Sequence, residues 1–202
     1  LLNIDLDKND KVIICMNDSI DFPISFLGAI WAGVIPICIN TMLPKEDLKY
    51  MLNDSEAKAV ICSEKLFNTF LDLKIENEKD ILIISNAEHN YASNKDKVFN
   101  LKSMILYDKE DQPPAKTRVD SHCFWLYSSG STGRPKGTIH LHESLIKTAN
   151  LYASNILNIN EKDIFFSAAK LFFAYGLGNA LTFPLSVGAT CILTKERPTV
   201  EL

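Results

Sequence analysis

The chain has 202 residues, of which 47% are hydrophobic and 23% are charged, and its formal net charge is −4. This length suits one large domain or one and a half, and the hydrophobic share is enough for a substantial core. The negative charge, and the lack of a basic stripe with interleaved aromatic residues, argue against a nucleic-acid partner. No membrane span is expected, because the longest apolar stretches, 24–39 and 171–187, are broken by glycine and proline.

The N-terminal stretch 1–10 is polar and acidic, which is unlike a signal peptide. The chain begins without methionine, and residues 194–202 show no pattern typical of a C-terminal tail. We therefore expect a fragment of a longer polypeptide. Its cysteines are scattered, odd in number and without a C-x-x-C pair, which predicts buried free thiols in a reducing, cytoplasmic compartment. They are Cys15, Cys38, Cys62, Cys123 and Cys191.

In the first half, short apolar and β-branched runs alternate with helical patterns. Ser19 is expected to cap a helix that has Pro23 in its first turn and ends at Gly33, and Pro44 is expected to start the next helix. The polar stretch 86–100 indicates a surface loop, and 108–120 is the best linker candidate. Strands are predicted at 11–16, 34–39, 59–62 and 81–85, and helices at 19–31, 44–53, 64–73 and 101–107.

In the second half, strands are predicted at 123–127, 138–141, 164–169 and 189–194, and helices at 142–156 and 175–186. The first of these helices should turn Leu145, Ala149, Tyr152, Ala153 and Ile156 to one side. This βαβα alternation predicts an α/β fold with layered parallel sheets covered by helices. Ligands in such sheets collect at the carboxyl ends of strands.

The segment 124–137, FWLYSSGSTGRPKG, is an apolar run that breaks into hydroxyls, glycines and basic residues. Its three glycines can adopt positive φ and have no Cβ, so backbone N–H groups can close around an anion. Arg134 and Lys136 add positive charge, and Pro135 stiffens the exit. We interpret the segment as a nucleotide-phosphate loop. Its glycines and hydroxyl residues are Ser128, Ser129, Gly130, Ser131, Thr132, Gly133 and Gly137.

This loop differs from the Walker pattern, because Lys136 stands between Pro135 and Gly137. The alternative is an ordinary polar turn between strands. Such turns rarely combine four hydroxyls, three glycines and a lysine directly after a hydrophobic strand, and the phosphate interpretation is therefore favoured.

A second candidate site is the segment 167–181, SAAKLFFAYGLGNAL, where aromatic residues alternate with small ones after a strand. Small residues next to flat ones could form a slot for a planar apolar ligand, although Phe172 could equally be core. A dinucleotide-binding oxidoreductase is an alternative, since Gly176 and Gly178 begin a G-x-G-x-x-G pattern and Glu196 stands where a ribose-binding acid would. That pattern fails at its third glycine, which is Leu181.

The histidines carry weaker signals. His140 and His142 are spaced H-x-H, as in some metal sites, but only Glu143 stands nearby as a further ligand, so a non-metal role is favoured. His142 could instead begin a helix and contact the phosphate loop. His89 is expected to be exposed, and His122 has no special signal.

The segment YSSGSTGRPKG at 127–137 resembles the phosphate-loop signature of adenylate-forming enzymes, [ST]-[ST]-G-[ST]-T-G-x-P-K-G, at every fixed position. This superfamily includes acyl-CoA synthetases, peptide-synthetase adenylation domains and luciferases. The resemblance implies that Thr132 and Lys136 are catalytic. It also implies a set of residues that bind ATP and pyrophosphate, namely Ser128, Ser129, Gly130, Ser131, Thr132, Gly133, Lys136, Gly137 and His142.

The upstream segment FLGAIWAGVIPICINTMLPKEDLKYMLNDSEAKAVI also resembles this family, so the resemblance covers nearly the whole chain. It implies a partial N-terminal AMP-binding domain over 1–202, without the family's C-terminal domain. Within it, 1–110 is a portion of the first α/β subdomain, and 121–202 holds the phosphate loop and the acid pocket. The stretch SAAKLFFAYGLGNALTFPLSVGAT is similar to benzoate-CoA ligases, which implies that Phe173, Ala174, Tyr175 and Gly176 contact the acid.

The implied reaction uses ATP to convert an aromatic carboxylate, benzoate or a hydroxybenzoate, to an acyl-adenylate, from which coenzyme A displaces AMP. The family's Mg²⁺-binding glutamate, adenine-stacking motif and late lysine have no match here, so these residues alone are not expected to catalyse. A fatty acyl-CoA ligase of the same superfamily is the main alternative. A non-catalytic nucleotide-binding module is the alternative from another class.

Overall fold

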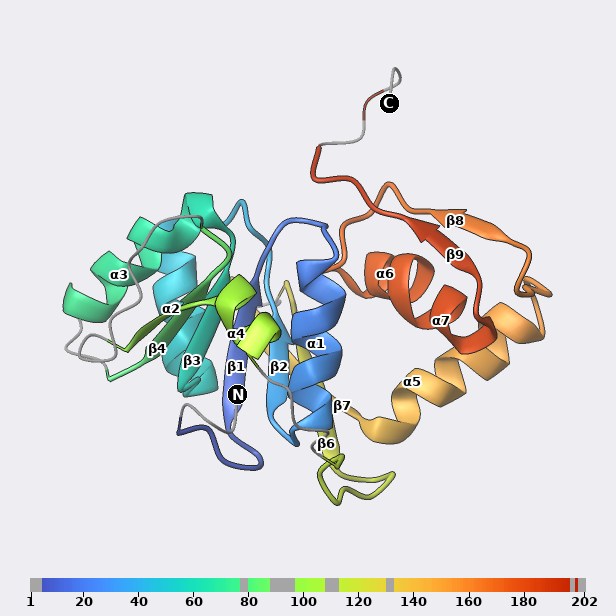
Figure 1. Ribbon diagram of the computed structural model, residues 1–202, viewed down its shortest axis with the longest axis horizontal. Coiled ribbons are helices and arrows are strands. Elements are labelled where there is room, and N and C mark those ends of the chain that lie inside the picture. Colours follow the sequence, from blue (N-terminus) through green and yellow to red (C-terminus); the bar gives the residue numbers. More distant parts are fainter. Residues whose placement is uncertain are drawn as a thin grey trace.

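The computed structural model describes residues 5–76, 80–87, 97–107, 113–129, 133–196 and 199. Within them, one large sheet has the strand order β5-β4-β3-β1-β2-β6-β7 (Figure 1). Neighbouring strands from β5 to β6 pair in parallel, whereas β7 pairs with β6 antiparallel. The strands are β1 (Lys11–Cys15), β2 (Ile35–Cys38), β3 (Ala59–Cys62), β4 (Leu82–Ser85), β5 (Val98–Asn100), β6 (His122–Ser128) and β7 (Lys136–Leu141).

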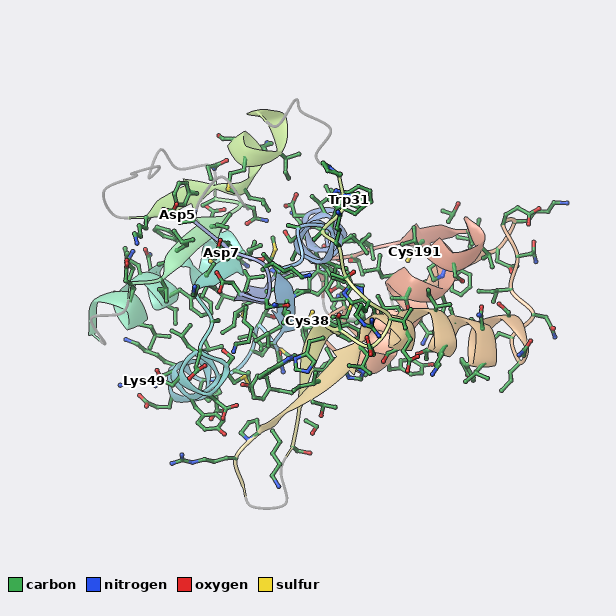
Figure 2. All side chains as sticks on the ribbon, turned by 90° about the horizontal axis from the view of Figure 1, so that it is seen from below. Asp5, Asp7, Trp31, Cys38, Lys49 and Cys191 are labelled. Atoms are coloured by element: carbon green, nitrogen blue, oxygen red, sulfur yellow. The ribbon has the colours of Figure 1, made fainter. Side chains whose placement is uncertain are left out.

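Helices cover both faces of this sheet, which explains why its central strands are apolar at nearly every position. Val12 and Ile14 of β1 share a core with α1 (Asp21–Trp31) and α4 (Leu101–Tyr107). Ile13 of the same strand faces α2 (Lys45–Ser55) and α3 (Phe67–Glu76). Figure 2 looks along α1 and α2, which lie on opposite sides of the sheet.

The second half of the chain packs against the side of the sheet that α1 covers (Figure 1). There Leu171, Leu177 and Leu181 join the core that contains Phe26 and Phe124. This half also contains a separate small sheet of two parallel strands, β8 and β9. Its elements are α5 (His142–Thr148), which continues as a π-helical segment (Ala149–Ser154), β8 (Ile164–Phe166), α6 (Ala174–Leu177), a second π-helical segment (Gly178–Thr182), α7 (Phe183–Val187) and β9 (Thr190–Ile192).

The α/β class and most predicted elements are confirmed, and the differences have local causes. The predicted loop 86–100 ends in strand β5, which is too short and too polar at Asn100 to show a strand pattern. Strand β7 is antiparallel because it follows β6 through a tight hairpin, and the parallel interpretation was wrong there. The α1 helix starts at Asp21, and Ser19 contributes only its carbonyl, which accepts from the Phe22 N–H at 3.1 Å, not a side-chain cap.

The long helix predicted at 142–156 ends at Ser154, and its inward side is only partly correct. Ala149 and Ala153 are buried, whereas Tyr152 is 41% and Ile156 is 64% exposed. The π-helical segment adds residues per turn, so a side calculated with the α-helical period loses its phase there.

The five cysteines are free thiols, four of them buried in the strands of the large sheet, which confirms their interpretation as buried thiols except at the half-buried Cys191. Burial raises the pKa of the Cys62 thiol to about 12. Across the described ranges, the structure contains no helix of the length and apolarity that a bilayer crossing requires.

Candidate nucleotide and acid site

The predicted phosphate loop joins β6 to β7, and Figure 2 shows the adjoining ends of these two strands extending away from the rest of the sheet. Ser128 ends β6 and is the cross-strand partner of Lys136, which begins β7. Directly opposite residues of an antiparallel pair point to the same face, so this hydroxyl and this ammonium share one side of the hairpin. Both side chains and Ser129 are exposed. Gly130, Ser131 and Thr132 lie outside the described residues.

The two described glycines of the hairpin are required for different reasons. Gly133 has a φ of 86°, as the sequence interpretation expected for an anion-binding turn. Gly137 does not use the positive φ that a glycine can adopt. A Cβ on Gly137 would lie 3.0 Å from the Trp125 ring and 3.5 Å from the Tyr127 ring. Gly137 is therefore required because the Trp125 and Tyr127 rings pack against its backbone.

The hairpin has two faces with different surroundings. Trp125 and Tyr127 pack on the α2 side of the sheet. Phe124 and Leu126 point to the opposite face, where they join the α1 core. The alternation continues to Ser128, so the face with Ser128 and Lys136 is also the face of Phe124 and Leu126.

A cavity of about 110 Å³ lies on this face, between the hairpin, α5 and the helical segment that follows Ala174. An apolar cavity of about 150 Å³ holds one benzene molecule, so the space between these elements is somewhat smaller than a single ring needs. Its lining includes Phe124, His140, Leu145, Thr148, Ala174 and Gly178. The Phe124 and His140 rings stack with centroids 4.5 Å apart. Burial lowers the pKa of His140, which favours the neutral imidazole at this wall.

The four predicted acid-contact residues have different environments. Ala174 lines the cavity. Tyr175 is 69% and Phe173 is 46% exposed, and neither lines it. Gly176 is buried, and a Cβ there would lie 2.0 Å from the Lys170 carbonyl oxygen. Close backbone packing thus explains Gly176. Phe172, which the sequence left open between core and pocket, is core.

The turn 171–176 is held in place by a buried carboxylate that sequence reasoning missed. Asp18 is 4% exposed, and its Oδ1 accepts the Leu171 N–H at 3.0 Å. The Lys170 ammonium lies 3.9 Å from its Oδ2. Burial raises the pKa of Asp18, against a smaller lowering by Leu171 and Lys170. Its place just beyond a strand's carboxyl end was the available signal.

His142 begins α5 as expected, but it does not meet the loop. Leu141 pairs with His122 at the start of β6, whereas Lys136 pairs with Ser128 at its end. The whole length of β7, roughly 17 Å at 3.4 Å per residue, separates His142 from the loop. The described residues therefore place His142 at the opposite end of β7 from Lys136, and its role in binding ATP stays a prediction.

Among the described residues there is no group of three or more histidine, cysteine, aspartate or glutamate side chains that could hold a metal ion. His140 is stacked on Phe124, and His142 has its backbone N–H bonded to the Ser121 carbonyl oxygen at 3.2 Å. The Mg²⁺-binding glutamate that the family resemblance implies stays an expectation for the part of the protein outside this chain.

The family model of AMP-binding enzymes matches residues 1–201, and the chain belongs to this family. It is 50% identical over 196 residues to a benzoate–CoA ligase of Thauera aromatica, covering 96% of this chain and 36% of that protein. It is 35% identical over 203 residues to a 4-hydroxybenzoate–CoA/benzoate–CoA ligase of Rhodopseudomonas palustris, covering 100% of this chain and 36% of the relative.

Among solved structures, a benzoate CoA ligase from Burkholderia xenovorans superposes with a TM-score of 0.88 at 41% identity. The match covers 100% of this chain and 38% of that one. The chain thus spans little more than a third of the length of these relatives. Its fold is that of the N-terminal domain of adenylate-forming enzymes.

Proposed function

We propose that the protein carrying this chain uses ATP to activate an aromatic carboxylate, benzoate or a hydroxybenzoate, and transfers the acyl group to coenzyme A. The observation that carries this proposal is the shared face of the hairpin, which presents Ser128 and Lys136 and also lines a small apolar cavity with Ala174. Family membership and the names of the relatives support it. Residues 1–110 and 121–202 are then two portions of one N-terminal AMP-binding domain.

The first step needs an acid oxygen to attack the α-phosphorus of ATP while pyrophosphate departs. Carboxylates acylate poorly because their oxygen is a bad leaving group, and adenylation replaces it with a good one. Negative charge grows on the departing pyrophosphate, so aligned donors and a cation lower the barrier. Lys136, the hydroxyls of Ser128 and Ser129 and the turn at Gly133 are suited to this task. Gly130, Ser131, Thr132 and Gly137 are assigned to the same loop by resemblance, with Thr132 as a catalytic partner of Lys136.

The cavity favours an aromatic acid over the alternative of a fatty acid. Its volume is small, about 110 Å³, and Phe124 and the neutral His140 give it a flat wall. The small side chains of Ala174 and Gly178 leave that space open. Phe173, Tyr175 and Gly176 stay predicted acid contacts by resemblance. Mg²⁺ would supply charge neutralisation on the phosphates, and we assign no residue of this chain to it.

The test is ATP–pyrophosphate exchange by the intact protein with benzoate, 4-hydroxybenzoate, butyrate and octanoate. We expect exchange with the aromatic acids, and a loss of about 10²–10³-fold in Lys136→Ala, the size seen when one transition-state donor is removed. Lys147→Ala is the matched control, since Lys147 is an exposed lysine paired with Glu143 on α5.

Exchange with octanoate or butyrate alone would discard the aromatic pocket and favour a fatty acyl-CoA ligase. Nucleotide binding without exchange for any acid would favour a non-catalytic nucleotide-binding module. Equal exchange in Lys136→Ala and Lys147→Ala would remove Lys136 from the proposed site.

A further inference from the structure

The face of the hairpin that points away from the cavity carries a tyrosine bound to a distant carboxylate. The Tyr127 hydroxyl donates to Asp54 Oδ2 at 2.7 Å. Asp54 lies in the last turn of α2, far from the hairpin in sequence. A short hydrogen bond to an ionised carboxylate is about twice as strong as one between neutral groups. Tyr127 immediately precedes Ser128, so this bond fixes the end of β6 at the point where the loop begins.

The other flank of the loop contacts the same helix. The Arg134 guanidinium lies over the Tyr50 ring, 5.3 Å from its centroid, a cation–π distance. The Tyr50 hydroxyl donates to Asp54 Oδ1 at 3.3 Å. One carboxylate therefore binds two tyrosines, of which one belongs to β6 and the other supports the residue that precedes Pro135 and Lys136.

The position of Asp54 is unfavourable for α2 itself. A carboxylate in the last turn of a helix meets the negative end of the helix dipole, and this turn contains no basic residue. Glu56, two residues further on, adds more negative charge, although it lies 3.7 Å from the Lys11 ammonium. A residue that breaks a local rule is a candidate for a role outside its own helix. Burial and the neighbouring Asp54 raise the pKa of Tyr127, so its hydroxyl remains a donor.

We propose that Asp54 is a positioning residue for ATP, which acts by holding both flanks of the phosphate loop to α2 through Tyr127, Tyr50 and Arg134. The anchored face is opposite the face of Ser128 and Lys136, so the anchor does not occupy the ligand's side. It fixes where these two groups stand relative to the phosphates and does not touch the acid. This inference rests on the proposed function for its kinetic effect, but the anchor itself can be measured separately.

The kinetic test uses the intact protein with Asp54→Ala, Tyr127→Phe and the double variant. We expect the KM for ATP to rise about tenfold in each single variant, the size of one lost charge-assisted hydrogen bond, with little change in the KM for the acid. The double variant should be no worse than Asp54→Ala, because both changes remove the same bond. Glu56→Gln, which removes a charge at the same helix end, is the matched control and should behave as the wild type.

The second readout is trypsin cleavage after Lys136, since the Arg134–Pro135 bond is resistant. Cleavage should be faster in Asp54→Ala and Tyr127→Phe than in the wild type and in Glu56→Gln. Unchanged cleavage, or an equal loss of ATP and acid affinity with a lowered Tm, would overturn the inference and leave Asp54 a structural residue. If the wild type exchanges with no acid, the proposed function fails, and the cleavage rates still decide whether α2 anchors the loop.

Discussion

The hairpin tip and the turn 171–176 both place small residues beside a candidate ligand, but they are held in different ways. The described residues beside the tip, Ser129 and Gly133, are exposed, and the described contacts of this region to the rest of the molecule run through Tyr127 and Arg134. The turn is held by its backbone, through the Leu171 N–H bond to Asp18 and the close approach of Gly176 to the Lys170 carbonyl.

This difference indicates a division of tasks. A loop whose flanking strands are held by side chains can adjust around a polyphosphate, whereas a turn fixed by its backbone keeps one shape for a rigid ring. The turn should therefore be sensitive to single atoms added to its backbone, and the tip should tolerate them better. The following substitutions test this contrast, beginning with the largest expected effect.

Gly176→Ala should destabilise the protein most. The new Cβ would lie 2.0 Å from the Lys170 carbonyl oxygen and 2.6 Å from that of Ala169, and backbone atoms cannot move aside as a side chain can. We expect a loss of about 3 kcal/mol or more in the free energy of unfolding, measured by urea denaturation. Gly28→Ala is the control, because a Cβ on this exposed helical glycine meets nothing within 4 Å. It should raise stability by up to about 1 kcal/mol. Equal effects of the two would contradict the close packing of the turn.

Substitutions of Asp18 test the hydrogen bond that holds the turn 171–176 at Leu171. Asp18→Ala leaves the buried Leu171 N–H without its acceptor and should cost about 1–3 kcal/mol. Asp18→Asn keeps an acceptor oxygen and removes the buried charge. Because burial raises the pKa of Asp18 above its ordinary 3.8, its contribution to stability is full below about pH 3.8 and is lost as pH rises through the folded value.

The stability of Asp18→Asn relative to the wild type should accordingly improve from pH 4 to pH 7 in urea denaturation. A relative stability that instead declines over this range would show that the ionised Asp18 is favoured in the fold, because the Leu171 N–H and the Lys170 ammonium then outweigh burial.

Gly133→Ala should have the smallest effect on stability. Its φ of 86° is unfavourable for alanine, but a Cβ there meets nothing within 4 Å, so we expect a cost of about 1–2 kcal/mol. Gly188→Ala is the matched control, with a φ of 73° and equally open surroundings after α7. Both should lose similar stability, but only Gly133→Ala should slow ATP–pyrophosphate exchange. Equal exchange rates in the two variants would contradict a role of Gly133 in binding the phosphates.

Sequence reasoning succeeded where one local signal determines the structure. The β-branched runs of β1, β3 and β4 and the glycine at Gly133 are examples, because burial on both faces and a left-handed φ each leave a local pattern. Sequence reasoning failed where the structure depends on contacts between segments that lie far apart in the sequence. The separation of His142 from the loop depends on the direction of β7, and the need for Gly137 depends on rings two strand positions apart on β6. The bond between Asp54 and Tyr127 joins the end of α2 to the hairpin, and its local trace is weak, a carboxylate in a last helical turn that has no basic residue, which does not name the partner.

The antiparallel pairing of β6 and β7 also has a consequence for the order of folding. These two strands are joined by the short connection 129–135, whereas β2 and β6 meet only after β3, β4 and β5 have been synthesised between them. Hairpins close in about 1–10 μs, while pairing across a long intervening chain must first overcome its closure entropy. The hairpin that carries the phosphate loop is thus a rapidly formed unit, and its docking onto β2 is the slow event that joins the two halves of the chain.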